Sequence, residues 1–464
     1  MWLCSTQIQM WVRVLAGFLA VAALTQGEGE WKVTDVDRIV DLTSQVIKVQ
    51  STVTFENIGA SEQNSVKIVL SEKEDAHLAY LQVQEDGSQG KLRYTKDKSA
   101  NHEGFQVYKV ELLKRVPKGG ALKLKITYRV TQSLKPLPTK IEQSEQQFVI
   151  YEGNAYFAAA YPVTKEKSTV KLPTGKLLSA TTHNPSKQET ERLTYGPYAD
   201  QPAFNSKPIN VHFENNAPFL VATVVERVIE ISHWGNIAVE EYVELEHRGA
   251  ELKGTFSRID FQMDRRGRRQ PAVQQWTTVL PATAKDIYYR DEIGNISTSG
   301  VRVRADSVDV EIKPRYPLFG GWRTSYVIGY NVPSYEYLYK KGNDYALRMR
   351  LLDHVMDNIV VEKLTTKIII PELARNIKIV TPYTVDRRPD ELKKTYLDVS
   401  GRTVLVVQKD NLVNDHIQMM TVSYEFTDWH MLYEPLYAVG FFLAFFLFVI
   451  FYVRLDFSMK TTNQ

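Results

Sequence analysis

The triplet Asp35-Val36-Asp37 is the first place in the chain where metal-dependent chemistry could be sought, because paired carboxylates of the D-x-D form can hold a metal-bound nucleotide sugar. The triplet opens the first expected strand, and such triplets are common, so we assign it no metal role. The nine histidines show no H-E-x-x-H pair or other metal-ligand spacing. The sequence also lacks a P-loop, a G-x-G-x-x-G loop and a G-x-S-x-G elbow. We therefore predict no catalytic, cofactor-binding or metal-binding residues.

A dense arginine cluster lies in the second half of the chain and consists of Arg265, Arg266, Arg268 and Arg269. It lies between two apolar strand segments, so we interpret it as the tip of a hairpin. Guanidinium groups at this density could clamp a phosphate or an acidic partner. A solvated turn without a specific ligand is the alternative, because exposed charge clusters usually contribute little.

The second half also contains two aromatic segments, PRYPLFGGW (314–322) and YNVPSYEYLY (330–339). Their prolines and the Gly-Gly pair interrupt regular strands. Their side chains Phe319, Trp322, Tyr335 and Tyr337 could form a partner interface, because aromatic anchors serve interfaces as well as cores. A packed loop that caps a β domain is the alternative, and the sequence leaves both open.

The two ends of the chain predict its relation to a membrane. Residues 1–27 resemble a signal peptide, with a positive charge at Arg13 before a short apolar run. Residues 436–453 contain no ionisable side chain and predict a membrane-spanning helix, preceded by a linker over 429–435. The tail over 454–464 carries Arg454 and Lys460, which predicts that it faces the cytosol. The chain is therefore expected to be a type I protein of an early secretory membrane.

Composition limits what the part in the lumen can do. The single cysteine, Cys4, lies inside the expected signal peptide, so the mature chain can form neither a disulfide nor a thiolate metal site. Burial must therefore stabilise the fold, and a hydrophobic content of 44% is sufficient for two or three domains. The net charge of +3 gives no basis for nucleic-acid binding. Asn295 begins the one N-x-Ser/Thr sequon and is expected to carry a glycan on the surface.

Short alternating runs such as VIKVQSTVTF (46–55) indicate half-buried strands, and long helical periods are scarce, so we predict a mainly β fold. The chain also repeats itself: RIVDL (38–42) aligns with RVIEI (227–231), and VKLP (170–173) resembles IIIP (368–371). After one inserted residue, a second aligned set pairs Val53, Phe55, Asn57 and Gly59 with Val243, Leu245, His247 and Gly249. We therefore predict two tandem β-sandwich-like domains, 28–219 and 220–428. Within the predicted span, Gly440 and Ala444 form a small-xxx-small pair that would allow another helix to pack closely.

Five segments resemble the ribophorin I family, which is subunit 1 of the endoplasmic reticulum oligosaccharyltransferase. They are the two aromatic segments above, DEIGNIS (291–297), PDEL (389–392) and YVRLDFS (452–458). The resemblance covers essentially the whole mature chain. Animal members of the family usually continue into a longer cytosolic segment, whereas this sequence stops at Gln464.

The resemblance implies a non-catalytic subunit without a cofactor. Its partners would be the catalytic and other subunits, nascent polypeptides, the translocon and the endoplasmic reticulum membrane, but no nucleic acid. The complex transfers an oligosaccharide from dolichyl diphosphate to Asn of Asn-x-Ser/Thr, and this subunit would support assembly and substrate presentation. The W-W-D-Y-G motif of the catalytic subunit is absent here. The alternative is a free type I luminal chaperone or cargo receptor, and a stand-alone hydrolase is disfavoured by the missing catalytic motifs.

Overall fold

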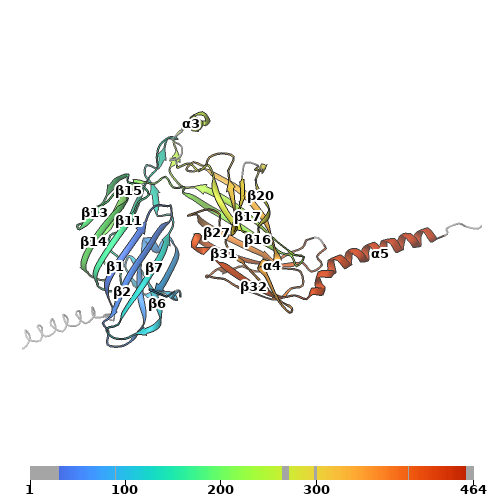
Figure 1. The fold of residues 1–464 in the computed structure, drawn as a ribbon, viewed down its shortest axis with the longest axis horizontal. Coiled ribbons are helices and arrows are strands. Elements are labelled where there is room, and N and C mark those ends of the chain that lie inside the picture. The colour runs from blue at the N-terminus through green and yellow to red at the C-terminus, as the bar shows by residue number, and fades with distance from the viewer. Residues whose placement is uncertain (1–30, 89, 264–270, 297–299, 396, 456–464) are drawn as a thin grey trace, which may run out of the picture. The chain divides into compact units, whose positions relative to one another are not determined.

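The computed structural model describes residues 31–88, 90–263, 271–296, 300–395 and 397–455, and it is mainly β with one long C-terminal helix (Figure 1). This confirms the predicted fold class. The expected signal peptide and residues 456–464 lie outside the described residues. The chain forms two compact units: unit 1 contains the residues up to Phe219, together with Arg248–Ala272 and Phe319–Gly321, and unit 2 contains the rest.

Unit 1 is built from one large sheet and two smaller ones around a single hydrophobic core. The large sheet has the order β13 (Ser186–Gln188), β14 (Arg192–Gln201), β11 (Val163–Lys171), β1 (Trp31–Asp41), β2 (Ile47–Asn57), β7 (Ala121–Val130) and β4 (Leu78–Glu85). The second sheet has the order β12 (Leu177–Ala180), β15 (Pro208–Glu214), β10 (Phe148–Asn154) and β8 (Leu134–Pro136). The third has the order β3 (Gln63–Ser71), β6 (Phe105–Val116) and β5 (Tyr94–His102). The short helix α2 (Glu72–Ala76) follows β3.

Unit 2 likewise contains one large sheet, one four-stranded sheet and one three-stranded sheet around a hydrophobic core. Its large sheet has the order β21 (Gly294–Asn295), β20 (Lys285–Asp291), β24 (Arg323–Pro333), β17 (Asn236–His247), β16 (Leu220–Ile231), β27 (Val360–Ile369), β31 (Arg402–Leu412) and β29 (Asp386–Arg387), with β30 (Glu391–Lys393) also on β31. The second has the order β25 (Leu338–Lys341), β26 (Asp344–Arg350), β32 (Met419–Glu425) and β28 (Arg375–Val380). The third has the order β19 (Trp276–Pro281), β23 (Ser307–Ile312) and β22 (Gly300–Val303). Its helical segments are α4 (Ser334–Tyr337), the 3₁₀ turns η2 (Asn414–His416) and η3 (Asp428–Leu432), and α5 (Tyr433–Arg454).

The two units share one strand arrangement, although the large sheet has seven strands in unit 1 and nine in unit 2. In each large sheet, the first strand (β1 or β16) lies between its antiparallel hairpin partner (β2 or β17) and a parallel strand from late in the unit (β11 or β27). The next neighbours, β7 and β14 in unit 1, correspond to β24 and β31 in unit 2. The three-stranded order β3-β6-β5 likewise corresponds to β19-β23-β22.

The strand registers place the aligned residues of the two halves at equivalent positions. Val53 is opposite Val36 in unit 1, and the aligned Val243 is opposite Val225 in unit 2. Both first strands also contain a bulge at the same place. At that bulge the hydroxyl of Thr34 donates to the carbonyl of Thr54 at 3.3 Å, and in unit 2 the hydroxyl of Thr223 donates to that of Glu244 at 3.5 Å. A shared bulge is a specific backbone feature and therefore supports duplication more strongly than alternating hydrophobicity does.

Unit 1 also includes two stretches from the half of the sequence assigned to the second domain. The first contributes β18 (Glu251–Leu252), which pairs with β9 (Lys140–Ile141), and the helix α3 (Arg258–Met263). The second stretch is fixed by Gly320, where an added Cβ would lie 1.9 Å from the carbonyl oxygen of Ala250. A side chain cannot be accommodated at that distance, so the Gly-Gly pair of the aromatic segment serves a close backbone approach.

Candidate functional site

Three carboxylates in the described part of the chain lie close enough to hold a metal ion: Glu372, Asp398 and Glu434, whose oxygens lie within 4.8 Å of one another. A cationic side chain already occupies this group. The Nε of Arg402 lies 3.1 Å from Asp398, its Nη2 lies 3.0 Å from Glu434, and its Nη1 lies 3.2 Å from Glu230. The arrangement is therefore an ion-pair network centred on an arginine, and it supplies no open metal position.

The Arg402 network connects α5 to the body of unit 2. Asp398 belongs to the loop before β31, Glu230 to β16, and Glu434 to the first turn of α5. The carboxylate of Glu372 accepts hydrogen bonds from the backbone N–H groups that follow Asp398. Burial acts to raise the pKa of Glu372, but these hydrogen bonds and that of Ser400 outweigh it and lower the pKa.

A second buried ion pair lies in the core of unit 2. Arg227 on β16 contacts Glu241 on β17 and Asp353, with its Nη1 3.0 Å from the Asp353 carboxylate. The hydroxyl of Tyr330 on β24 donates to Asp353 and accepts from Arg227. Burial alone would raise the pKa of Asp353, but Arg227 and Tyr330 stabilise the anion and hold the pKa below its usual value. These groups stabilise one another, and none of them lines either pocket found in the part of the chain that the structure describes.

Arg38 on β1 occupies the equivalent position in unit 1, but its partners differ. Its guanidinium donates to the Ser168 hydroxyl at 3.1 Å and to the carbonyls of Asn154, Ala155 and Tyr156. The nearby Glu166 is buried and accepts a hydrogen bond from a backbone N–H. Burial raises the pKa of Glu166, although that hydrogen bond and Arg38 act to lower it.

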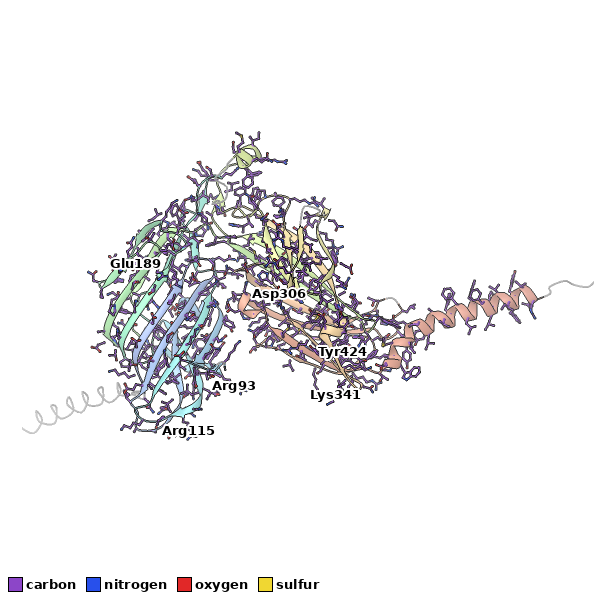
Figure 2. All side chains as sticks on the ribbon, viewed as in Figure 1. Arg93, Arg115, Glu189, Asp306, Lys341 and Tyr424 are labelled. Carbon is purple, nitrogen blue, oxygen red and sulfur yellow. The ribbon has the colours of Figure 1, made fainter. Side chains whose placement is uncertain are left out.

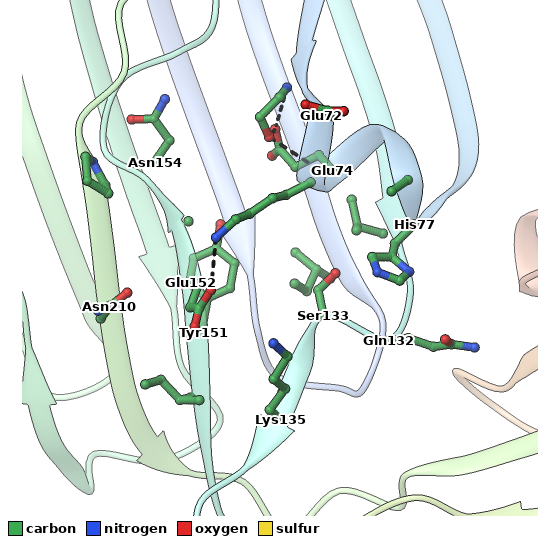
Figure 3. A pocket seen from close by; sticks show the side chains of 18 of the residues that line it. Glu72, Glu74, His77, Gln132, Ser133, Lys135, Tyr151, Glu152, Asn154 and Asn210 are labelled. Atoms are coloured by element: carbon green, nitrogen blue, oxygen red, sulfur yellow. Dashed lines mark hydrogen bonds and ion pairs between the residues drawn. The ribbon is translucent and has the colours of Figure 1, made fainter. Parts of the chain in front are cut away.

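Unit 1 contains a pocket of about 570 Å³ beside α2 (Figure 3). One wall is α2, and the other walls come from β8, β10 and β15. Glu74 of α2 is held at this site by Tyr128, whose hydroxyl donates to it at 2.9 Å, and by the Ser71 cap. An ion pair between Lys73 and Glu152, with a separation of 3.1 Å, joins α2 to β10 across the pocket.

The lining of this pocket suits non-covalent binding. Its polar groups are mostly hydroxyl, amide and paired charged side chains, and Ile47, Val130 and Ile150 supply apolar surface. Such a mixture can hold a polar chain through hydrogen bonds and apolar contact. The Lys73–Glu152 pair is exposed, so it contributes little stability and can be displaced by a ligand.

The structure places the predicted site residues in different environments. Asn295 ends β21 and is exposed, whereas Ser297 of its sequon lies outside the described residues. Arg265, Arg266, Arg268 and Arg269 also lie outside them. The segment before the arginines is the helix α3 and not a strand, because Phe261 packs one helical face onto Phe256 and Phe319.

The four aromatic residues of the predicted interface do not form one surface. Phe319 is buried in unit 1, where it packs against Phe256 and Phe261. Trp322 is half-buried against Tyr316. Tyr337 is half-buried with its hydroxyl 3.2 Å from Thr283, so among the four only Tyr335 of α4 is largely exposed.

Helix α5 includes the predicted span and is apolar enough to cross a membrane. Its side chains project outward along its length (Figure 2). Gly440 and Ala444 are exposed on it, and an added Cβ on Gly440 would meet nothing within 4 Å. The small-residue face is therefore open to another helix.

Sequence reasoning missed Arg402, the partners of Arg227 and the pocket. Arg402 and Glu230 are 172 residues apart in the sequence, and Arg227 and Asp353 are 126 apart. The alignment of Arg38 with Arg227 was the available signal, because an arginine repeated in the middle of two core strands needs buried partners.

The duplicated sheets and the apolar helix define a mainly β protein with one C-terminal helix that is able to span a membrane. The family model described as Ribophorin I matches residues 31–453, and the chain belongs to this family. It is 58% identical over 444 residues to "Dolichyl-diphosphooligosaccharide--protein glycosyltransferase subunit 1" of Caenorhabditis elegans, covering 96% of this chain and 75% of that protein. It is 34% identical to subunit 1B of Arabidopsis thaliana, covering 96% and 97%. Among solved structures, yeast LTA4 hydrolase matches 39% of this chain and 28% of its own, with 12% identity and a TM-score of 0.28.

The buried cluster in unit 2 yields a stability prediction. Arg227→Met should lower the free energy of unfolding by about 3–5 kcal/mol, because Glu241 would stay buried without a cation and Asp353 would keep only the contact with Arg350, at 3.4 Å. Urea unfolding of the full chain in mild detergent, followed by circular dichroism, measures this loss. The control Arg290→Met removes an exposed pair with Glu240 and should cost less than about 1 kcal/mol.

Adding Glu241→Gln and Asp353→Asn to Arg227→Met should recover part of the loss, because no charge is then left unpaired. If Arg227→Met is as stable as the Arg290→Met control, the cluster does not stabilise unit 2.

Proposed function

We propose that this chain is a non-catalytic subunit of the oligosaccharyltransferase complex, in the position of subunit 1. The observation that carries the proposal is the 58% identity with subunit 1 of the nematode complex over 96% of this chain. The matched residues cover almost the whole chain and therefore include both units and α5. An identity of 58% over that length is more than a shared fold alone would require.

The side-chain arrangements support a non-catalytic role. In the carboxylate group closest to a metal site in the described residues, Arg402 is paired with Asp398 and Glu434, and Arg227 is paired with the buried carboxylates Glu241 and Asp353 of unit 2. These acidic groups stabilise the fold and are not positioned as a paired acid and base around a substrate cavity. Transfer of the oligosaccharide would then take place on another subunit.

The proposed location is the endoplasmic reticulum membrane, with units 1 and 2 in the lumen. Helix α5 follows unit 2 directly, and its C-terminal end carries Arg454, which favours the cytosolic side. The proposed partners are the catalytic and other subunits of the complex, nascent polypeptides and the translocon. The pocket in unit 1 is wide enough to hold a few residues of an extended polypeptide, which supports a part in substrate presentation.

Purification in mild detergent followed by mass spectrometry tests the proposal. The chain should co-purify with the catalytic subunit in constant ratio, and the chain purified alone should not transfer an oligosaccharide from a dolichyl diphosphate donor. A free chaperone or cargo receptor would instead bind changing clients and separate from the catalytic subunit. Transfer by the isolated chain would contradict the non-catalytic assignment.

Glycosylation of Asn295 tests the luminal topology. Asn295 is exposed at the end of β21, so an oligosaccharide can reach it if unit 2 lies in the lumen. Endoglycosidase treatment of protein from cells should shift the band by the mass of one glycan, and Asn295→Gln should remove the shift. An unchanged band for the wild-type chain would place this loop outside the lumen.

Packing by α5 is a further expectation. Replacing both Gly440 and Ala444 with Leu should preserve membrane insertion, because Leu partitions favourably into lipid. The larger side chains should block close approach by a partner helix, so the amount of catalytic subunit retained in detergent should fall. The matched control is the double variant Leu443→Ile and Leu447→Ile, which exchanges large apolar side chains for others of the same size and leaves Gly440 and Ala444 unchanged. Equal retention by both variants would mean that α5 only anchors the chain.

A further inference from the structure

The end of unit 2 from which α5 leaves carries exposed apolar side chains from distant parts of the sequence. Trp234, in the turn between β16 and β17, is 66% exposed, and Trp429 of η3 is 72% exposed. Leu397 and Val399, in the loop between β30 and β31, are also exposed. We call the surface formed by these four residues the collar. Exposed apolar residues grouped in this way indicate contact with a partner or a membrane.

Ring contacts hold the hairpin tip of the collar next to the start of α5. The ring of His233 lies 4.2 Å from that of Phe426, which lies 5.5 Å from His430. The ring of His430 in turn lies 5.4 Å from Tyr433, the first residue of α5. Trp234 lines a small cavity of about 60 Å³ together with His430 and other residues of this junction.

Ion pairs hold the loop that carries Leu397 and Val399 close to the first turn of α5. Asp398, which lies between Leu397 and Val399, binds Arg402, and Arg402 binds Glu434 in the first turn of α5. Glu434 is two residues before the apolar span begins at Leu436, which corresponds to a rise of about 3 Å along the helix. The headgroup layer is about 5–8 Å thick on each side of the hydrocarbon core. A loop bound to Glu434 therefore lies at headgroup depth once α5 spans the bilayer.

We propose that the collar docks into the headgroup layer of the membrane that α5 crosses. The inference rests on the proposed membrane span. Tryptophan rings favour this layer, because they place an apolar body toward the lipid and an N–H toward water. Leu397 and Val399 gain by leaving water, whereas Arg402 and its carboxylates remain with the polar headgroups. Unit 2 is then held on the membrane surface in one orientation instead of moving freely on a tether.

The test uses the full chain, with Cys4→Ser, reconstituted in phosphatidylcholine vesicles whose acyl chains are brominated near the headgroup. Val399→Cys, Tyr437→Cys and Tyr316→Cys are each labelled with a small fluorophore, and quenching by the bromolipid is measured. Tyr437 lies in α5 and reports insertion of the span. Tyr316 is the matched control because it is exposed and binds the backbone of Arg323, at the other end of β24. Arg323 is the first residue of the eleven-residue strand β24, and Pro333 at its other end lies beside the collar. The ten steps between them correspond to about 33 Å.

We expect fluorescence to be lost at positions 399 and 437 and retained at 316. Quenching at 437 without quenching at 399 would overturn the collar proposal and leave the span intact, whereas absence of quenching at 437 would refute the span itself. Trp234→Phe gives an independent measurement, because it should reduce the quenched fraction of tryptophan fluorescence while buried Trp276→Phe should not. If position 399 is unquenched in vesicles but shielded from a water-soluble thiol reagent in the purified complex, the collar is a subunit interface and the proposal is wrong.

Discussion

Each unit is organised around one arginine buried in the middle of its largest sheet. Arg38 and Arg227 lie on the first strand of their units, between the hairpin partner and the parallel strand from late in the unit. A buried guanidinium requires hydrogen-bond acceptors, because an unpaired buried charge is strongly destabilising, and Arg227 finds them at both of its terminal nitrogens although its Nε has none among the described residues. The loops that follow β10 and β26 supply those acceptors. The arginine therefore ties the second sheet of each unit to the first.

The duplicates meet this requirement with different chemistry. In unit 2 the acceptors are the carboxylates of Glu241 and Asp353, whereas in unit 1 they are mainly backbone carbonyls, and Ser51 occupies the position of Glu241. The aligned tyrosines also differ in their partners, because Tyr330 binds Asp353 inside the core but Tyr128 binds Glu74 of α2. In unit 1 the carboxylate that binds this tyrosine therefore belongs to α2, which forms one wall of the pocket. The same helix lines the pocket of unit 1, so this change of partners lies directly beside that pocket.

Local patterns allowed the mainly β fold class and the long apolar helix to be predicted, although α5 begins at Tyr433, inside the predicted linker over 429–435. Alternation of apolar residues identifies strands, but the pairing of Val53 with Val36 came only with the structure. The site residues depended on contacts that local patterns do not contain. For Phe319 the sequence left an interface and a packed loop equally open, because aromatic residues serve both surfaces and cores, and its burial goes with the close approach of Gly320 to Ala250. Arg402 gave no signal, because its carboxylate partners come from three separate segments.

The sequence has a single cysteine and so cannot form a disulfide within the chain, which makes Arg402 more important than a single ion pair would be. Exposed ion pairs contribute less than about 1 kcal/mol, because water screens them and two side chains lose freedom. Arg402 is only 13% exposed and binds three carboxylates, so one ordered side chain makes several bonds. Two of these carboxylates belong to the sheet and its loop, and the third to α5. A force that tilts α5 must therefore either break this network or move β16 and β31 with the helix. Helix α5 and unit 2 are therefore coupled, and a partner helix that fixes the tilt of α5 also fixes the orientation of unit 2.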